Sequence, residues 1–402
     1  MKNLTSKYTF LHINYWAIYS ALSGFTAVYM MALGMKASQI GIAMACSSIF
    51  SSIVQPPLAT FADSTRKFTI RNITIFIAAL GLLMVIRLNI VPGSRSTKAV
   101  MFVSSMALTN IMLPLINSIS VYYNNRGQYI NYGLSRGIGS FSYAVMSYIL
   151  GYTVRMFGEG TITLTALILY IILIIAIMQF KMPKKSSDMV SEMASEGNEN
   201  NENKQNFFIK HKRYMLLLFG VVFSFSFHSM TNTYMIQIME MLGGDSRQMG
   251  ISVALAAALE LPTMMLFSRI VKRINSANLM KIAALSFFIK SVIFFMAGSV
   301  FAIYAGQIMQ MFSFALFIPA SVYYANLIMD EKDKVKGQAF MTTSFTLSGV
   351  LGNLLGGYLI DIIGVHNMMG VSVSFALIGF IIVSMGADSR KENEIMKSEG
   401  LN

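Results

Sequence analysis

The chain contains little cysteine and little charge. One of its 402 residues, Cys46, is a cysteine, so neither a disulfide nor a cysteine-ligated metal site can form within the chain. Only 12% of the residues are charged, compared with about 25% in ordinary soluble proteins. Because 55% of the residues are hydrophobic, this composition predicts a protein that lies in a lipid bilayer.

Several chemical signatures are also missing. The sequence has no Gly-x-x-x-x-Gly-Lys phosphate-binding loop, which argues against ATP-driven pumping by this chain. It has neither metal-ligand spacing nor a nucleophile–base signature, so we expect no enzyme activity, no metal ion and no cofactor. The alternation that is typical of β-barrel strands is absent as well.

Apolar runs make up most of the chain. Each is close to the length of about 20 residues with which a helix crosses a bilayer core. A polar stretch over 181–213 divides them into two groups of six. We therefore predict an all-α polytopic membrane protein with 12 transmembrane helices. The runs cover 11–33, 39–61, 70–91, 100–123, 133–154 and 160–180, then 214–241, 249–268, 276–298, 300–328, 338–362 and 367–387.

The same division predicts the domains. An N-terminal six-helix bundle covers 1–180, a cytoplasmic linker 181–213, a C-terminal six-helix bundle 214–388 and a cytoplasmic tail 389–402. The centre of the linker is acidic and rich in Asn, a composition that is typical of disordered segments. We interpret the linker as slack between the two bundles.

The formal net charge of +13 comes from cations in the loops between the apolar runs. Lys and Arg concentrate in the cytoplasmic loops of membrane proteins. With the N-terminus inside, the inner loops hold most of these cations. We expect a multi-pass protein of the plasma membrane with both termini in the cytoplasm. Its partner is then the lipid bilayer and not nucleic acid.

The two halves share short motifs at a common offset of roughly 206–210 residues. Such an offset indicates two parallel six-helix repeats, which is the plan of major facilitator transporters. The matching glycines, each with similar neighbours, are Gly34 with Gly243, Gly127 with Gly337, and Gly158 with Gly364.

Longer stretches carry a more specific resemblance. Over essentially its whole length the chain resembles a major facilitator superfamily transporter, and within it the branch of lactose permease and the nucleoside–proton symporters. The resemblance implies two pseudo-symmetric six-helix bundles and transport by alternating access, with the solute site between the halves. The stretches look like the end of helix 2 with its loop, helix 5, helix 10 and helix 11, and they are Gln55–Lys67, Gly133–Tyr143, Gly306–Ala320 and Gly337–Gly357.

Glu260 is the sharpest candidate for a functional residue. It lies inside an apolar run, where a carboxylate is costly unless it is paired, hydrated or protonated. Its candidate role is therefore proton coupling, with Lys290 of the next run as its charge partner. The resemblance implies that Glu260 stands where the family has its helix-8 carboxylate, and that Lys290 stands where lactose permease has its helix-9 arginine. Two other interpretations stay open, a permanent structural pair and a Lys290 that reaches an interface.

In the N-terminal half, the resemblance implies that Arg136 is a substrate-binding arginine. A guanidinium suits sugar hydroxyls, carboxylates or phosphates. Tyr143 follows two helical turns later on the same face and is a second candidate. Asn117 stands where lactose permease has an acid, and we predict that it lines the same cavity. The alternatives are a membrane-interface anchor for Arg136 and simple packing for Tyr143.

Histidine contributes one further candidate. His228 is the only histidine that we place well inside a predicted helix, because His12, His211 and His366 lie near predicted helix ends. An imidazole titrates near neutral pH, so His228 is a candidate proton relay.

Neutral polar residues of the C-terminal half complete the predicted lining. Amides both donate and accept, which suits a polyhydroxylated or nucleoside-like solute. Hydrogen bonding between helices is the alternative role. Lactose permease carries a lysine, a histidine and a glutamate where this chain has Gln307, Gln310 and Ser313, so the resemblance implies neither galactoside specificity nor the full proton relay. Asn232 is the fourth predicted residue.

Charges at helix ends predict gates. Asp63, Arg66 and Lys67 lie in the loop after the second run, and Asp361 lies at the end of the eleventh. These charges could pair with neighbouring helix ends in one conformation and release them in the other. Ordinary solvation of helix ends is the alternative.

We therefore expect a secondary active transporter, acting as a monomer, that imports a small polar solute (sugar, glycoside or nucleoside) with a proton. An efflux carrier or facilitator for amphipathic compounds is the second hypothesis. A membrane sensor that transports nothing is the third, because fold alone does not establish function.

Overall fold

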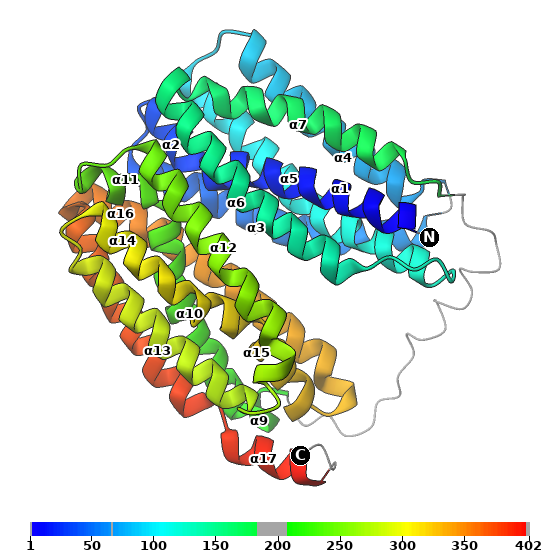
Figure 1. Ribbon diagram of the computed structural model, residues 1–402, viewed down its shortest axis with the longest axis vertical. Helices are drawn as coiled ribbons and strands as arrows, with labels where there is room; N and C mark the ends of the chain where they lie inside the picture. Colours follow the sequence, from blue (N-terminus) through cyan, green and yellow to red (C-terminus); the bar gives the residue numbers. More distant parts are fainter. Residues whose placement is uncertain (1, 66, 183–206, 399–402) are drawn as a thin grey trace. The chain divides into compact units, whose positions relative to one another are not determined.

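The computed structural model describes residues 2–65, 67–182 and 207–398 (Figure 1). The central part of the predicted linker, 183–206, lies outside the described residues. The C-terminal end of the predicted linker is helical, because α9 covers Phe207–Lys210 and α10 begins at Lys212. The regular elements in the described part of the chain are all helices, as the sequence predicts.

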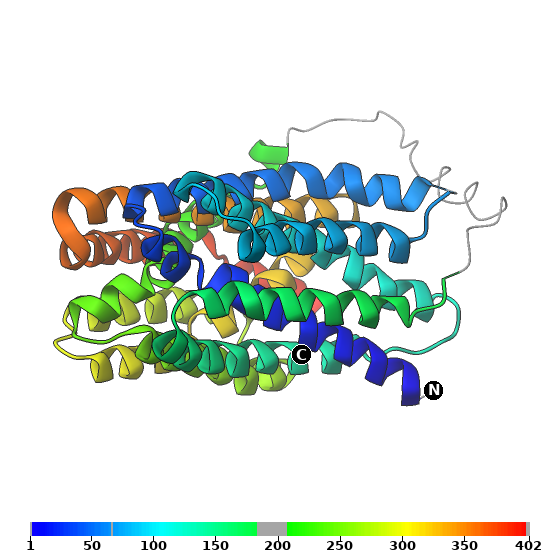
Figure 2. The ribbon, with the colours of Figure 1, turned by 90° about the horizontal axis from the view of Figure 1, so that it is seen from above.

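The described chain separates into two compact units. Within each unit the helices run side by side (Figure 2). The first unit comprises the described parts of Met1–Gly34 and Cys46–Lys204, and the second those of Met35–Ala45 and Gln205–Asn402. The start of α3 therefore belongs to the second unit and the rest of that helix to the first.

In the described residues the helices follow one another in a simple order. Up to residue 182 they are α1 (Lys2–Tyr19), η1 (Ser20–Gly24), α2 (Thr26–Ala32), α3 (Ala37–Ser64), α4 (Ile70–Ile90), α5 (Arg95–Asn124), α6 (Tyr132–Phe157) and α7 (Gly160–Met178). After it come α10 (Lys212–Thr233), α11 (Met235–Met241), α12 (Ser246–Ile270), α13 (Ser276–Phe295), α14 (Val300–Gln307), η3 (Ile308–Met311), α15 (Phe314–Ile328), α16 (Glu331–Gly386) and α17 (Ser389–Ser398).

These elements account for the twelve predicted spans. Nine continuous helical segments of the described chain are long and apolar enough to cross a membrane. The tenth predicted span, which is one of these segments, contains the 3-10 helix η3. Outside the nine segments lie the first predicted span, which the π-helix η1 interrupts, and the fifth, which is α6 (Tyr132–Phe157). The element α16 contains two spans, which meet at Gly364, where the backbone is not helical. The predicted twelve-helix all-α fold is confirmed.

The glycine pairs that suggested an internal repeat have matching backbones. Gly34 and Gly243 both have φ of 76°, and Gly158 and Gly364 both have φ of 83°. A positive φ is strained for residues with a side chain, so glycine is the natural residue at each of these helix ends. The third pair differs, because Gly127 has a positive φ and Gly337 lies within a helix.

The second unit is held together by close helix crossings. The helix α10 packs against the last span of α16, and small residues let the two backbones approach. A Cβ on Gly220 would lie 2.7 Å from the backbone nitrogen of Val383, and one on Gly386 would lie 2.5 Å from that of Leu217. Beside this crossing an aromatic core surrounds Phe225.

The C-terminal helix α17 is fixed to the second unit by a carboxylate. Glu392 is fully buried. It accepts hydrogen bonds from the backbone nitrogens of Ser276 (2.8 Å) and Ala277 (2.7 Å) and from Oγ of Ser276 (2.6 Å). These residues form the first turn of α13, whose exposed N–H groups and dipole favour an anion. Glu392 therefore joins the chain end to α13.

The variant Glu392→Ala is expected to release α17. Loss of these charge-assisted hydrogen bonds should lower the free energy of local opening by about 3 kcal/mol and speed trypsin cleavage after Arg390 or Lys391 roughly 100-fold. Timed proteolysis read by mass spectrometry measures the rate. Glu394→Ala, which removes an exposed carboxylate of the same helix, is the matched control. Equal cleavage rates in the two variants would contradict the capping role.

Candidate functional site

A chain of three side chains lies inside the second unit. The ammonium of Lys290 donates to Oε1 of Gln310 at 2.6 Å, and Nε2 of Gln310 donates to Oε1 of Glu260 at 2.8 Å. One amide therefore links the cation and the acid that the sequence predicts as partners. Lys290 is fully buried, so the interpretation in which it reaches an interface is wrong.

Local backbone structure explains how Gln310 reaches both partners. It lies in η3, a 3-10 turn between α14 and α15. Such a turn inside a helix changes the direction of the following side chains and often marks a functional position. Lys290 projects from α13, whose inner face is apolar, and Glu260 comes from α12, two residues before Pro262. A buried ammonium among apolar groups is costly unless polar partners satisfy it.

His228 lies in the same unit beside an aromatic wall. Its ring stacks on Phe314 with centroids 4.9 Å apart and meets Phe287 edge-on at 5.7 Å. Nδ2 of Asn232, one turn later on α10, lies 2.9 Å from Nε2 of His228. The structure thus brings together these two predicted residues, and the amide fixes the orientation of the imidazole.

The other two predicted residues of the tenth span have different roles. Gln307 is buried, and its Nε2 donates to Oγ of Ser252 on α12 at 2.9 Å. Its Oε1 has no hydrogen-bond partner among the described residues. The hydroxyl of Ser313 donates to the backbone oxygen of Met309 at 2.7 Å. Ser313 therefore satisfies the backbone oxygen of Met309 where the helix is interrupted, and this contact is structural.

In the first unit, Arg136 lies against an aromatic residue of α1. Its guanidinium carbon lies 3.8 Å from the centroid of the Trp16 ring, and its Nη1 donates to Oγ of Ser140. Tyr143, two turns along α6, has its ring centroid 6.1 Å from that of Tyr19. Both predicted residues of α6 therefore face α1.

Asn117 is the third predicted residue of this unit. It lies on α5 and is partly buried. Its Oδ1 is shielded from solvent and accepts no hydrogen bond from any residue that the structure describes. A buried amide oxygen of this kind is a natural acceptor for a ligand or water.

One predicted gate residue makes a contact of the expected kind. The carboxylate of Asp361 accepts from the backbone nitrogens of Ala37 at 3.1 Å and Ser38 at 3.0 Å, the first residues of α3. This is a helix cap supplied by another helix. Lys67 is exposed, whereas Arg66 and the side chain of Asp63 lie outside what the structure describes.

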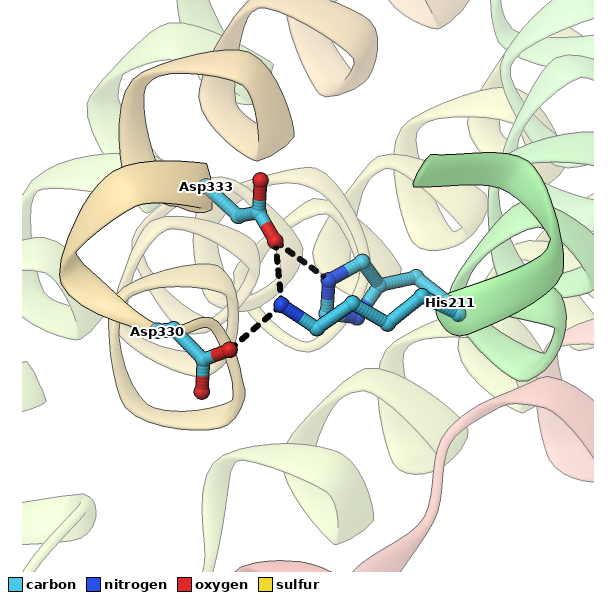
Figure 3. Close-up of polar contacts among 4 residues, drawn as sticks. His211, Asp330 and Asp333 are labelled. Carbon is cyan, nitrogen blue, oxygen red and sulfur yellow. Dashed lines mark hydrogen bonds and ion pairs between the residues drawn. The ribbon is translucent and has the colours of Figure 1, made fainter. Parts of the chain in front are cut away.

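A second charged cluster was not predicted from the sequence. His211 lies at the start of α10, and its Nε2 is 2.9 Å from Oδ2 of Asp333 on α16 (Figure 3). The ammonium of Lys210 donates to Asp333 at 2.8 Å and to Asp330 at 2.5 Å. Sequence spacing gives no signal for it, because its two halves lie more than a hundred residues apart in the chain.

Lys210 alters the titration of Asp330. The hydrogen bond from its ammonium holds the pKa of Asp330 below the ordinary value. A lowered carboxyl pKa gives stability that is present above the unfolded-state value and is lost as the pH falls through the folded-state value. The side chain of Asp330 is 68% exposed and that of Lys210 is 35% exposed, so salt screens this contribution.

Comparison with known proteins decides the family. The sequence matches the MFS_1 like family over residues 5–371. The chain belongs to the MFS_1 like family. The resemblance to major facilitator transporters is thereby confirmed, and this MFS_1 like protein is a transporter-type membrane protein rather than an enzyme.

Two bacterial relatives cover most of the MFS_1 like chain. The uncharacterized transporter YwbF of Bacillus subtilis (strain 168) is 23% identical over 377 residues, which cover 89% of this chain and 87% of YwbF. The maltose permease of Geobacillus stearothermophilus is 23% identical over 359 residues, which cover 86% of this chain and 83% of the permease.

Solved structures support the same fold. The crystal structure of the nucleoside transporter NupG superposes with a TM-score of 0.76 at 15% identity, covering 95% of this chain and 99% of NupG. An inward-facing bacterial homologue of the human lysosomal transporter Spinster has a TM-score of 0.71 at 12% identity and covers 98% of each chain. At these identities the likeness concerns the fold alone.

Proposed function

We propose that this MFS_1 like protein is a secondary active transporter that imports a small polar solute together with a proton by alternating access. The proposal places it in the plasma membrane as a monomer, with both termini in the cytoplasm. The observation that carries it is the hydrogen-bonded chain from Glu260 through Gln310 to Lys290.

The orientation of the Gln310 amide suggests how a proton affects the hydrogen bonds that link Glu260, Gln310 and Lys290. Its oxygen faces the ammonium of Lys290, and its nitrogen faces the carboxylate of Glu260. An ionised carboxylate only accepts, whereas a protonated one also carries a donor. Protonation of Glu260 therefore weakens the hydrogen bond that it accepts from the amide, and it removes the negative charge that is linked to Lys290. Such a change in buried charge can favour one conformation of the transporter over another.

Neutral polar groups near the three linked side chains fit an uncharged solute. His228 and Asn232 offer donors and acceptors beside the rings of Phe287 and Phe314. This combination suits a solute that has both a ring and hydroxyl groups. Two similar proteins are named as a maltose permease and a nucleoside transporter, and maltose and nucleosides are solutes of that chemical class. We therefore propose a sugar, glycoside or nucleoside.

We propose that the cap that Asp361 forms on α3 acts as a gate. The two backbone N–H groups of Ala37 and Ser38 are satisfied only while this cap is in place or water replaces it. We assign the cap the role of stabilising one conformation. The loop with Asp63, Arg66 and Lys67 has the same proposed role.

Uptake by proteoliposomes under an imposed pH gradient tests the proposal. We expect radiolabelled uridine or maltose to accumulate inside vesicles with an alkaline interior, because inward proton flow then drives the solute. A protonophore should return the solute to its external concentration. Equal equilibration with and without the gradient would instead support a facilitator, and net extrusion would support efflux.

A further inference from the structure

The α1 helix carries polar groups that the proposed proton site does not use. Trp16 and His12 lie four residues apart on α1, and therefore on one face of the helix. The predicted first span begins at residue 11 and puts His12 near a helix end. The structure corrects this, because α1 already begins at Lys2 and His12 lies in its middle, fully buried.

Trp16 is seated against α6 by a glycine. A Cβ on Gly139 would lie 2.5 Å from Cδ1 of Trp16, closer than two such carbons can approach. Only glycine therefore lets the indole lie this close to the helix. On the indole face lies the guanidinium of Arg136, at 3.8 Å from the ring centroid, a cation–π contact. The position of the indole is thus determined from two sides.

Buried polar atoms of this face have no partner among the described side chains and backbone. They are Nε1 of Trp16 and both ring nitrogens of His12. Each such group costs about 1–3 kcal/mol when it stays unsatisfied. The indole N–H is only a donor, whereas a neutral imidazole offers one donor and one acceptor. A hydroxyl-bearing solute supplies the complementary groups.

The backbone next to Trp16 is irregular as well. The π-helix η1 begins at Ser20, directly after Tyr19, whose ring meets that of Trp16 at 5.3 Å. The hydroxyl of Tyr143 would lie 3.1 Å from a Cβ on Gly24, the last residue of η1. Short π-helical turns inside α-helices occur frequently at functional sites. Here the π-turn directly follows Tyr19, whose ring centroid lies 6.1 Å from that of Tyr143 on α6.

We propose that Trp16 is a specificity-determining residue that donates a hydrogen bond from Nε1 to a ring or hydroxyl oxygen of the solute. His12 is a second polar contact of the same recognition site in the first unit. The chemical class is a neutral solute whose ring carries oxygen acceptors. This inference rests on the proposed solute transport and extends its site to α1.

Trp16 is the only tryptophan of the chain, so the unmodified protein reports on this site by itself. Purified protein in detergent is titrated with uridine and with maltose at constant pH while tryptophan emission is recorded. We expect a saturable change with at least one probe. The midpoint should match the KM of proteoliposome uptake for that probe.

Trp16→Phe removes the N–H and keeps an aromatic face for Arg136. Loss of one hydrogen bond should raise KM for the probe about tenfold, with the maximal rate and the thermal stability nearly unchanged. Gly139→Ala should displace the indole and shift its emission, whereas a Cβ on Gly137, on the same helix, meets nothing within 4 Å. Gly137→Ala is therefore the matched control.

The outcomes separate this inference from the proposed function. Uptake of a probe with unchanged emission and an unchanged KM in Trp16→Phe would overturn the role of Trp16 and leave transport standing. Emission that saturates with a probe, without proton-driven uptake, would support the recognition site and refute proton coupling. Absence of both emission change and uptake with uridine and maltose would refute both.

Discussion

Glu260→Gln is expected to abolish proton-driven accumulation while exchange of solute across the membrane continues. The substituted amide keeps the length of the side chain and an oxygen that accepts from Nε2 of Gln310. It cannot ionise, so proton binding at this position no longer changes the charge that is linked to Lys290 through Gln310. Uptake driven by a pH gradient should fall about 5- to 150-fold, the range of couplings worth 1–3 kcal/mol.

The measurement compares two modes in the same proteoliposomes, accumulation driven by the gradient and exchange at equal pH. Glu240→Gln is the matched control, since Glu240 is an exposed carboxylate at the end of α11 in the same unit. It should accumulate solute like the unmodified protein. Normal accumulation by Glu260→Gln would remove Glu260 from the coupling mechanism. Loss of exchange in that variant would assign it to solute binding instead.

Gly379→Ala is expected to destabilise the second unit severely. Gly379 lies where the last span of α16 crosses α10, and a Cβ there would lie 2.3 Å from Oγ and 2.6 Å from the backbone nitrogen of Ser224. The hydroxyl can rotate away, but the backbone nitrogen can move only with its helix. Overpacking of this kind costs about 1–3 kcal/mol and occasionally more, and we expect the upper end here.

Thermal unfolding of the purified protein measures this loss as a lower midpoint. Gly349→Ala is the control on the same helix element, because its Cβ would have only Oγ of Ser229 within reach, at 4.0 Å. That variant should unfold at or slightly above the original midpoint, since alanine favours a helix over glycine by about 1 kcal/mol. Equal midpoints for the two variants would show that α10 and α16 separate easily at this crossing.

Sequence patterns predicted the architecture well. Long apolar runs gave twelve spans because each must satisfy its own backbone as a helix in lipid. Repeated glycines indicated the internal duplication, and the matching positive φ angles of Gly34 with Gly243 and of Gly158 with Gly364 agree with it. A carboxylate and an ammonium in apolar runs singled out Glu260 and Lys290, because charges in such places are rare.

The sequence could not predict which residues meet. Gln310 was expected to line a solute cavity, and it proves to link Lys290 with Glu260 because the 3-10 turn η3 changes its direction. Trp16 and His12 received no role, since an aromatic residue and a histidine near a predicted helix end carry no signal by themselves. Their importance depends on Gly139 and Arg136 of another helix.

The sequence by itself thus determined that the protein lies in a membrane, how many helices it has and which acid in them is exceptional. These properties depend on composition and on the length of each run, which are local in the chain. Only the tertiary structure decided that one amide joins the cation to the acid and that α1 presents unsatisfied polar atoms next to Arg136. Such contacts depend on the rotation and register of neighbouring helices, and side-chain packing between segments distant in the chain fixes both.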